Sequence, residues 1–129
     1  MTEPKQVILS LDAPKPLSVY SQAIQSGSLL FLAGQIPLDP ISGQLVSGSI
    51  ADETECIMRN MSAVLSAAGA SLENIVKTTV YLTNMADFAE FNAAYGRHFP
   101  SAPPARTTVA VAALPRGVRI EIDAIAAVA

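Results

Sequence analysis

Two consecutive predicted strands near the end of the chain place polar side chains at alternate positions on one face: Arg106 and Thr108, then Arg119, Glu121 and Asp123. An arginine fork can bind a carboxylate through two hydrogen bonds. A glutamate close to apolar surface can hold and polarise a water molecule. This pattern indicates either a site for a small carboxylic acid or a solvated face with cross-strand ion pairs, and the pattern alone does not choose between them.

The loop between these strands decides whether Arg106 and Glu121 can act together. The strands are predicted over residues 105–112 and 118–128, joined by the four residues 114–117. If they pair as an antiparallel hairpin around that loop, the faces that carry Arg106 and Glu121 lie on the same side of the sheet. A loop longer or shorter by one residue would break this arrangement. On this register we expect one shared polar face.

Metal and nucleophile chemistry find little support in the sequence. His98 is the only histidine and Cys56 the only cysteine, so no pair of them has metal-ligand spacing. Cys56 adjoins a helical apolar stripe and is expected to be a buried, inert thiol. His98 lies near a predicted helix C-terminus, where a structural role suits it. We expect no metal site, and the sequence has neither a nucleophile-elbow motif nor a glycine-rich phosphate loop.

The bulk composition limits the class of protein. With 129 residues the chain is predicted to form one domain, residues 1–129. Its net charge is -3 and its eight Lys and Arg residues are scattered, which disfavours a nucleic-acid partner. No apolar run reaches the length of a membrane span, so a cytoplasmic protein is expected. Half of the residues are hydrophobic, and we expect some of them to be buried between copies of the chain.

The first half of the chain has the pattern of strands followed by a helix. Strands are predicted over residues 6–10, 17–25 and 28–35, with Ser26-Gly27 as a hairpin turn and a long loop over 37–49. Ser49 and Asp52 resemble a capping box that begins a helix. The helix is expected to end near Gly69, and its apolar stripe is Ile57, Met61, Val64, Leu65 and Ala68.

The second half adds a strand, a helix and the two C-terminal strands. Alternation and β-branched residues predict a strand over residues 75–83. Asn84 is expected to cap a helix that Pro100 ends, with the stripe Phe88, Phe91, Tyr95 and Phe99. This order predicts an α+β fold, a mixed sheet with both helices packed on one face. The other face would stay apolar, and a second copy of the chain is the economical cover for it.

Several motifs together resemble the reactive-intermediate deaminase family, also called the YjgF or L-PSP family. The most specific piece runs over residues 104–111, then Leu114-Pro115, then 120–126. Supporting pieces spread over most of the chain are residues 19–22, 33–37, 75–81 and Phe91-Asn92 with Tyr95 and Phe99. The resemblance implies a chorismate-mutase-like α+β fold that forms a homotrimer with a central barrel-like core. Ligands of such trimers bind in the clefts between subunits.

The resemblance also implies an activity and a set of site residues. Members with deaminase activity hydrolyse 2-aminoacrylate and related enamine or imine acids to 2-oxo acids and ammonia, without metal or cofactor. Arg106 is similar to the arginine that holds the substrate carboxylate, and Glu121 to the glutamate that positions the attacking water. The implied substrate-binding residues are Tyr20, Ala33, Gly34, Asn92 and Thr108. The expected partners are a small 2-imino or 2-oxo acid and further copies of this chain.

Some positions depart from the family pattern. Ala33 stands where serine is frequent, which removes one possible hydrogen bond to substrate, and Thr108 stands where cysteine is frequent. Ser18-Val19 replace a common Gly-Pro. These changes bear on substrate preference more than on reaction type, because the arginine and the glutamate are present. Two other functions stay open: an endoribonuclease or translation inhibitor, and a protein that binds 2-oxo acids without turnover.

Overall fold

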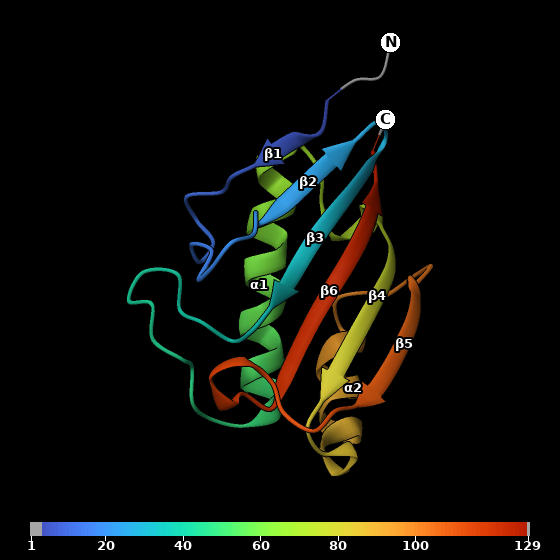
Figure 1. The fold of residues 1–129 in the computed structure, drawn as a ribbon. Coiled ribbons are helices and arrows are strands. Elements are labelled where there is room, and N and C mark those ends of the chain that lie inside the picture. The colour runs from blue at the N-terminus through green and yellow to red at the C-terminus, as the bar shows by residue number, and fades with distance from the viewer. Residues whose placement is uncertain (1–3, 129) are drawn as a thin grey trace.

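A mixed β-sheet forms one layer of the molecule and two helices form the other (Figure 1). The computed structural model describes residues 4–128. Its strands are β1 (Gln6–Ile8), β2 (Ala23–Ser26), β3 (Leu29–Gln35), β4 (Ile75–Leu82), β5 (Ala105–Ala110) and β6 (Ile120–Ala127), and its helices are α1 (Ile50–Ala67) and α2 (Phe88–Gly96). Short 3-10 turns cover Leu72–Asn74, Met85–Asp87 and Pro115–Gly117. The predicted order of elements and the α+β class are confirmed.

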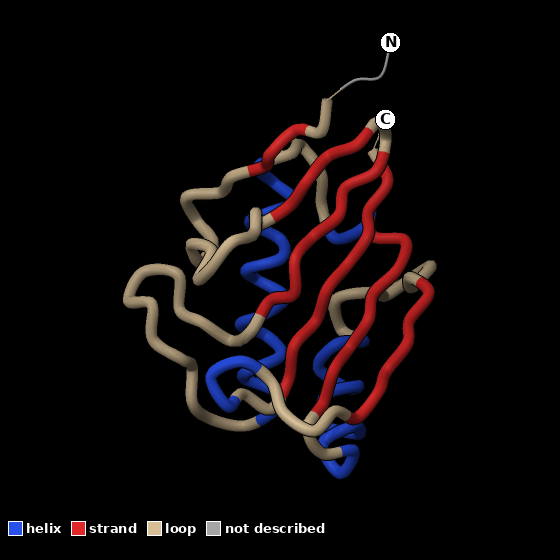
Figure 2. The backbone as a smooth tube through the Cα atoms, viewed as in Figure 1, coloured by secondary structure: helices blue, strands red, loops and turns tan. Residues whose placement is uncertain are grey.

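The strands lie side by side in the order β1-β2-β3-β6-β4-β5 (Figure 2). β4 and β5 run parallel, because α2 crosses one face of the sheet and returns the chain beside β4 in the same direction. β6 then inserts between β3 and β4 and pairs antiparallel with both. The predicted hairpin between the last two strands is therefore wrong. β4 separates them, and the connection runs over residues 111–119 rather than 114–117.

The strand register places Arg106 and Glu121 on opposite faces of the sheet. Arg106 lies opposite Thr78 of β4, whereas Glu121 lies opposite Tyr81 of the same strand. Positions 78 and 81 are an odd number of residues apart and so point to opposite faces. The expectation of one shared polar face is wrong, because it depended on a hairpin that β4 interrupts.

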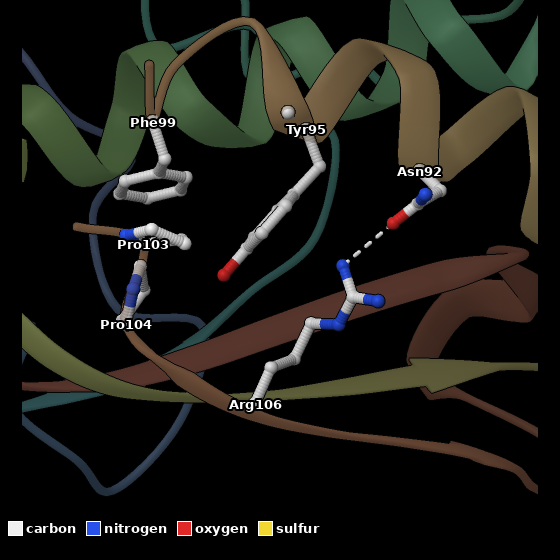
Figure 3. Close-up of a pocket in the computed structure, with 7 residues that line it drawn as sticks. Asn92, Tyr95, Phe99, Pro103, Pro104 and Arg106 are labelled. Atoms are coloured by element: carbon white, nitrogen blue, oxygen red, sulfur yellow. Dashed lines mark hydrogen bonds between the residues drawn. The ribbon is translucent and has the colours of Figure 1, made fainter. Parts of the chain in front are cut away.

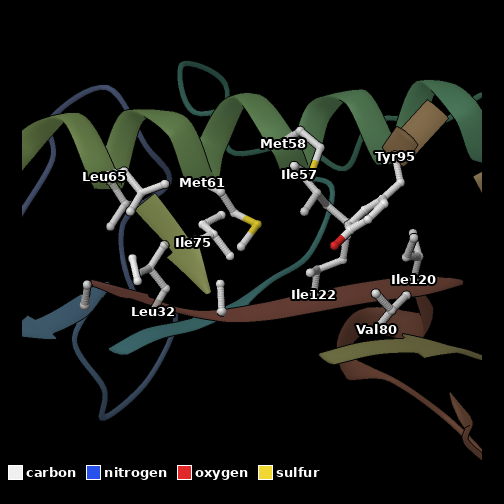
Figure 4. Close-up of a cluster of buried hydrophobic side chains, with 14 of the residues drawn as sticks. Leu32, Ile57, Met58, Met61, Leu65, Ile75, Val80, Tyr95, Ile120 and Ile122 are labelled. Carbon is white, nitrogen blue, oxygen red and sulfur yellow. The ribbon is translucent and has the colours of Figure 1, made fainter. Parts of the chain in front are cut away.

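The hydrophobic core fills the space between α1 and the sheet (Figure 4). α1 begins at the predicted capping box: the Ser49 hydroxyl accepts a hydrogen bond from the Asp52 N–H at 3.1 Å, and the Ser49 N–H donates back to Asp52 Oδ2 at 3.4 Å. Gly69 follows the helix with a φ of +74°, as a C-terminal cap requires. The predicted stripe is confirmed as core, with Ile57, Met61, Val64 and Leu65 all buried.

The second helix is shorter than predicted. α2 ends at Gly96 rather than at Pro100, and Asn84 caps the 3-10 turn before it, with Oδ1 accepting from the Ala86 N–H at 2.9 Å. The predicted aromatic stripe nevertheless packs as a row of tilted rings, with centroid distances between 4.8 and 6.2 Å: Phe88, Phe91, Tyr95 and Phe99. No helix among residues 4–128 is both long and apolar enough to cross a membrane.

The predicted strand over residues 17–25 is wrong in its first part. Residues 17–22 follow a bent path, and β2 begins only at Ala23. The buried Gln22 side chain explains the bend: its Oε1 accepts from the Ser10 N–H at 2.6 Å, and its Nε2 donates to the carbonyl oxygens of Ser10 and Pro14. The turn that follows is Gly27-Ser28, because Ser26 still pairs with Leu29.

The face of the sheet away from the helices carries apolar side chains that nothing in the described chain covers. Phe31, on a central strand, is 43% exposed. Three further exposed side chains share this face: Val7, Leu29 and Val109. This is the face for which the sequence predicted a second copy of the chain.

Candidate functional site

Arg106 projects from β5 under α2 and meets a wall of aromatic rings. Its Nη1 donates to Asn92 Oδ1 at 2.8 Å (Figure 3). The guanidinium carbon lies 5.0 Å from the centre of the Tyr95 ring, 5.5 Å from that of Phe88 and 5.6 Å from that of Phe91. Cation–π attraction and the amide therefore hold the guanidinium from one side.

A cavity of about 420 Å³ opens beside this arginine. It is lined by Asn92, Tyr95, Gly96, Phe99, Pro103, Pro104 and Arg106. The Tyr95 hydroxyl shares a 2.8 Å hydrogen bond with the buried Thr78 hydroxyl, and burial raises the pKa of Tyr95. Arg106 donates this one hydrogen bond within residues 4–128. Its other N–H groups are available for a bidentate partner such as a carboxylate.

Glu121 lies on the other face of the sheet, in a pocket of about 280 Å³. The pocket is lined by Leu17, Ser18, Tyr20, Ala33, Gly34, Ile36, Pro115 and Glu121. The pairing of β3 with β6 shifts register between Leu32 and Gln35, at the bulge that contains Ala33 and Gly34. Gly34 thereby comes against the Glu121 carboxyl group, where a Cβ atom would lie 2.9 Å from Cδ and overlap Oε2.

The electrostatic setting of Glu121 suits proton transfer. Burial among apolar side chains raises the pKa of this carboxyl, and the nearby charge of Asp123 raises it further. A carboxyl with a raised pKa is a stronger base when ionised, which suits a group that takes a proton and then returns it. The hydroxyl of Tyr20, which lines the same pocket, accepts a hydrogen bond from the Leu17 N–H at 3.1 Å.

The structure gathers the predicted site residues into two groups instead of one. Tyr20, Ala33 and Gly34 lie with Glu121, and Asn92 lies with Arg106. The two pockets share no lining residue. Thr108 follows Arg106 on the same face of β5, and its buried hydroxyl has no hydrogen-bond partner among residues 4–128.

Two side chains near the site have contacts that the sequence pattern did not predict. Tyr95, a member of the predicted aromatic stripe, also lines the Arg106 cavity, which the stripe by itself does not predict. Its position one helical turn beyond Asn92 was the available signal. Arg119, expected to share a face with Glu121, instead pairs with the buried carboxylate of Glu53 and donates to the Gly48 carbonyl at 2.7 Å. Arg119 therefore joins β6 to α1.

The remaining candidates occupy structural positions. Cys56 is buried, its thiol donates to the Leu38 carbonyl at 3.3 Å, and burial raises its pKa, as expected of an inert thiol. His98 Nε2 lies 2.9 Å from Glu55 Oε2 and links the end of α2 to α1.

Comparison with known proteins covers nearly the whole chain. The family model described as Endoribonuclease L-PSP matches residues 10–128. A RutC family protein of Pyrococcus horikoshii is 51% identical over 95% of this chain and 97% of its own length. Human 2-iminobutanoate/2-iminopropanoate deaminase is 46% identical over 95% of this chain and 89% of its own. The crystal structure of E. coli TdcF with bound serine, 35% identical, has a TM-score of 0.91 and covers 96% of this chain and 99% of its own.

Proposed function

Because this chain belongs to the L-PSP family, the reactive-intermediate deaminase or YjgF family, we propose that it hydrolyses reactive 2-imino and 2-enamino acids to 2-oxo acids and ammonia. The predicted fold of this family is confirmed by the match to its solved members. Such members bind small molecules, as TdcF binds serine. The observation that carries the proposal is a half-buried Glu121 carboxyl of raised pKa, set in an apolar pocket.

The working site is formed between two copies of the chain. One small substrate cannot contact both Arg106 and Glu121 of a single chain, because the two side chains leave opposite faces of the sheet. The cavity beside Arg106 is open, and so is the apolar face that carries Glu121. A cyclic homotrimer that covers this face would bring Arg106 and Asn92 of one subunit to the Glu121 pocket of the next. Three equivalent sites would result.

Arg106 supplies orientation in this site. A 2-imino acid carries a carboxylate next to the electrophilic imine carbon. Two parallel hydrogen bonds from the guanidinium fix that carboxylate and so present the imine carbon to the opposite wall of the cleft. Asn92 and the three rings hold the guanidinium plane while this happens.

Glu121 supplies the proton transfers. An enamine substrate first tautomerises to its imine. A water molecule held by the Glu121 carboxylate attacks the imine carbon and gives one proton to Glu121, and a C–O bond forms as the C=N bond becomes single. Glu121 returns this proton to nitrogen, which gives a carbinolamine. The carbinolamine hydroxyl then passes its proton through Glu121 to the amino nitrogen, the C–N bond breaks as the C=O bond forms, and ammonia and a 2-oxo acid leave. Positioning with acid–base help of a few kcal/mol, on the order of 10²–10⁴-fold in rate, is sufficient.

A dehydratase-coupled assay tests the proposal directly. A pyridoxal-phosphate dehydratase acting on serine or threonine generates the imine, and its disappearance is followed with and without this protein. The proposal expects faster loss of imine with the parent chain and not with Glu121→Gln. An equal rate with and without the parent chain would refute the activity and favour binding without turnover.

A ribonuclease is the second candidate, because the matching family model carries that description. The net charge of -3 and the scattered basic residues oppose it. Incubation with single-stranded RNA at low salt decides the matter. Cleavage that survives Glu121→Gln would indicate an activity separate from the proposed site.

A further inference from the structure

A hydrogen-bonded pair lies beside Glu121 on the open face of the sheet. The Tyr81 hydroxyl donates to Asp123 Oδ2 at 2.9 Å. Tyr81 is the cross-strand partner of Glu121 in the pairing of β4 with β6, and Asp123 is the next residue along β6 on the same face. Two positions along a strand correspond to about 6.6 Å. The pair therefore adjoins Glu121 both across the sheet and along its own strand.

Among residues 4–128, the groups that β3 and the neighbouring loop place against Glu121 are uncharged. β3 contributes Gly34, and the loop over the pocket contributes the Tyr20 hydroxyl. Lys77, farther along β4, donates its ammonium to the Thr78 carbonyl at 3.0 Å and to the hydroxyls of Thr79 and Thr107 at 3.3 Å. In the proposed trimer a second subunit adds its Arg106. Within residues 4–128, Asp123 is the neighbouring charge that raises the pKa of Glu121, after the larger effect of burial.

We propose that Asp123, fixed by the Tyr81 hydroxyl, is a positioning residue that acts through Glu121, its negative charge making the Glu121 carboxylate the stronger base. The inference rests on the proposed deaminase function. Glu121 must take a proton from water before it returns one to nitrogen, and a like charge nearby favours the proton-bound form. The Tyr81 hydrogen bond prevents the Asp123 carboxylate from turning away.

Tyr81 is suited to that task. Its hydrogen bond to Asp123, together with burial and the two carboxylates, raises the pKa of Tyr81. The hydroxyl therefore stays protonated and continues to donate over the whole range in which Glu121 titrates. A purely structural role for the pair, tying β4 to β6, would affect stability but would leave the titration of Glu121 unchanged.

The test follows the Glu121 carboxyl by carbon-13 NMR through a pH titration of the assembled protein. Asp123→Asn keeps the shape and can still accept from Tyr81, so it removes the charge alone. We expect the Glu121 midpoint to move to lower pH in Asp123→Asn, and the acidic limb of the kcat/KM profile to move with it. Asp123→Glu restores the charge and should return both toward the parent. Glu73→Gln makes the same change of net charge at a remote, exposed position and should leave both unchanged.

A second variant keeps the inference testable if Asp123→Asn does not fold. Tyr81→Phe frees the Asp123 carboxylate, and the Glu121 midpoint should move in the same direction by a smaller amount. A Glu121 midpoint that coincides in the parent, Asp123→Asn and Tyr81→Phe overturns the inference. The titration needs no turnover, so failure of the proposed function, seen as an inactive parent, is distinguished from failure of this coupling.

Discussion

Gly34 lies against the carboxyl group of Glu121 so closely that any side chain at position 34 would collide with it. The bulge in β3 produces this approach, and the backbone of Gly34 does not require the left-handed region. The glycine is therefore needed for space beside the carboxyl and not for its conformational freedom. This relationship gives a mutation that affects the site without straining the main chain.

Gly34→Ala should displace the Glu121 carboxyl and slow deamination while leaving the fold intact. A displacement of about 1 Å at a reacting group can reduce the rate on the order of 100-fold. Gly43→Ala is the contrasting variant: Gly43 has a φ of +71° and open space around it, so its substitution should lower the Tm and spare turnover. The dehydratase-coupled assay measures turnover of both variants, and thermal melts measure their Tm. Normal turnover in Gly34→Ala would contradict the role of this contact.

Glu121→Gln should raise stability at neutral pH while it removes activity. A carboxyl whose pKa is raised on folding contributes its stability fully below the unfolded pKa and loses it as the pH rises through the folded pKa. Ionised Glu121 therefore opposes folding at pH 7, and the neutral amide does not. The Tm advantage of the variant should shrink as the pH falls to about 4, where the parent carboxyl is also largely neutral. A parent that melts above the variant at pH 7 would show that Glu121 serves stability instead.

Substitutions of Arg106 and Arg119 distinguish a loss of turnover from a loss of stability. Arg106→Lys keeps the positive charge but loses the forked guanidinium, and Arg106→Ala loses both. A charged hydrogen-bonded pair contributes about 1.5–3 kcal/mol. Turnover should therefore fall by roughly tenfold to a few hundredfold. Arg119→Ala leaves the buried Glu53 unpaired and should lower the unfolding free energy by about 1.5–3 kcal/mol. Turnover at low temperature and unfolding free energy from denaturant titration should be measured on all three variants. A stability loss without a turnover loss in Arg106→Ala would mark Arg106 as structural.

Local patterns in the sequence predicted most of the fold but not the grouping of the site. Helical spacing of apolar residues identified α1 because one face of it packs on the sheet. Alternation identified β5 and β6, yet it contains no information about which strand lies between them. Residues 17–22 were mistaken for strand because the bend depends on the Gln22 amide meeting Ser10 and Pro14, far away in sequence. The family resemblance supplied the candidate residues, but the separation of Arg106 from Glu121 arises from β4, which the resemblance did not place.

The assembly is predicted to be a trimer in solution. This prediction rests on the uncovered apolar face around Phe31 and on the proposed sharing of the site between copies of the chain. Light scattering coupled to size exclusion should give about three chain masses of 13.5 kDa each. A monomer at micromolar concentration that still turns over imine would contradict a shared site.

Complementation between two inactive variants tests the shared site most directly. Arg106→Ala and Glu121→Gln subunits are co-refolded in equal amounts, and imine hydrolysis is compared with each variant refolded alone. If each site takes Arg106 from one subunit and Glu121 from its neighbour, random mixing restores both residues at about one site in four, and activity should return to roughly a quarter of the parent value. If both residues act within one chain, no mixed site is complete. A mixture as inactive as its components, with subunit exchange verified by mass, would contradict the account.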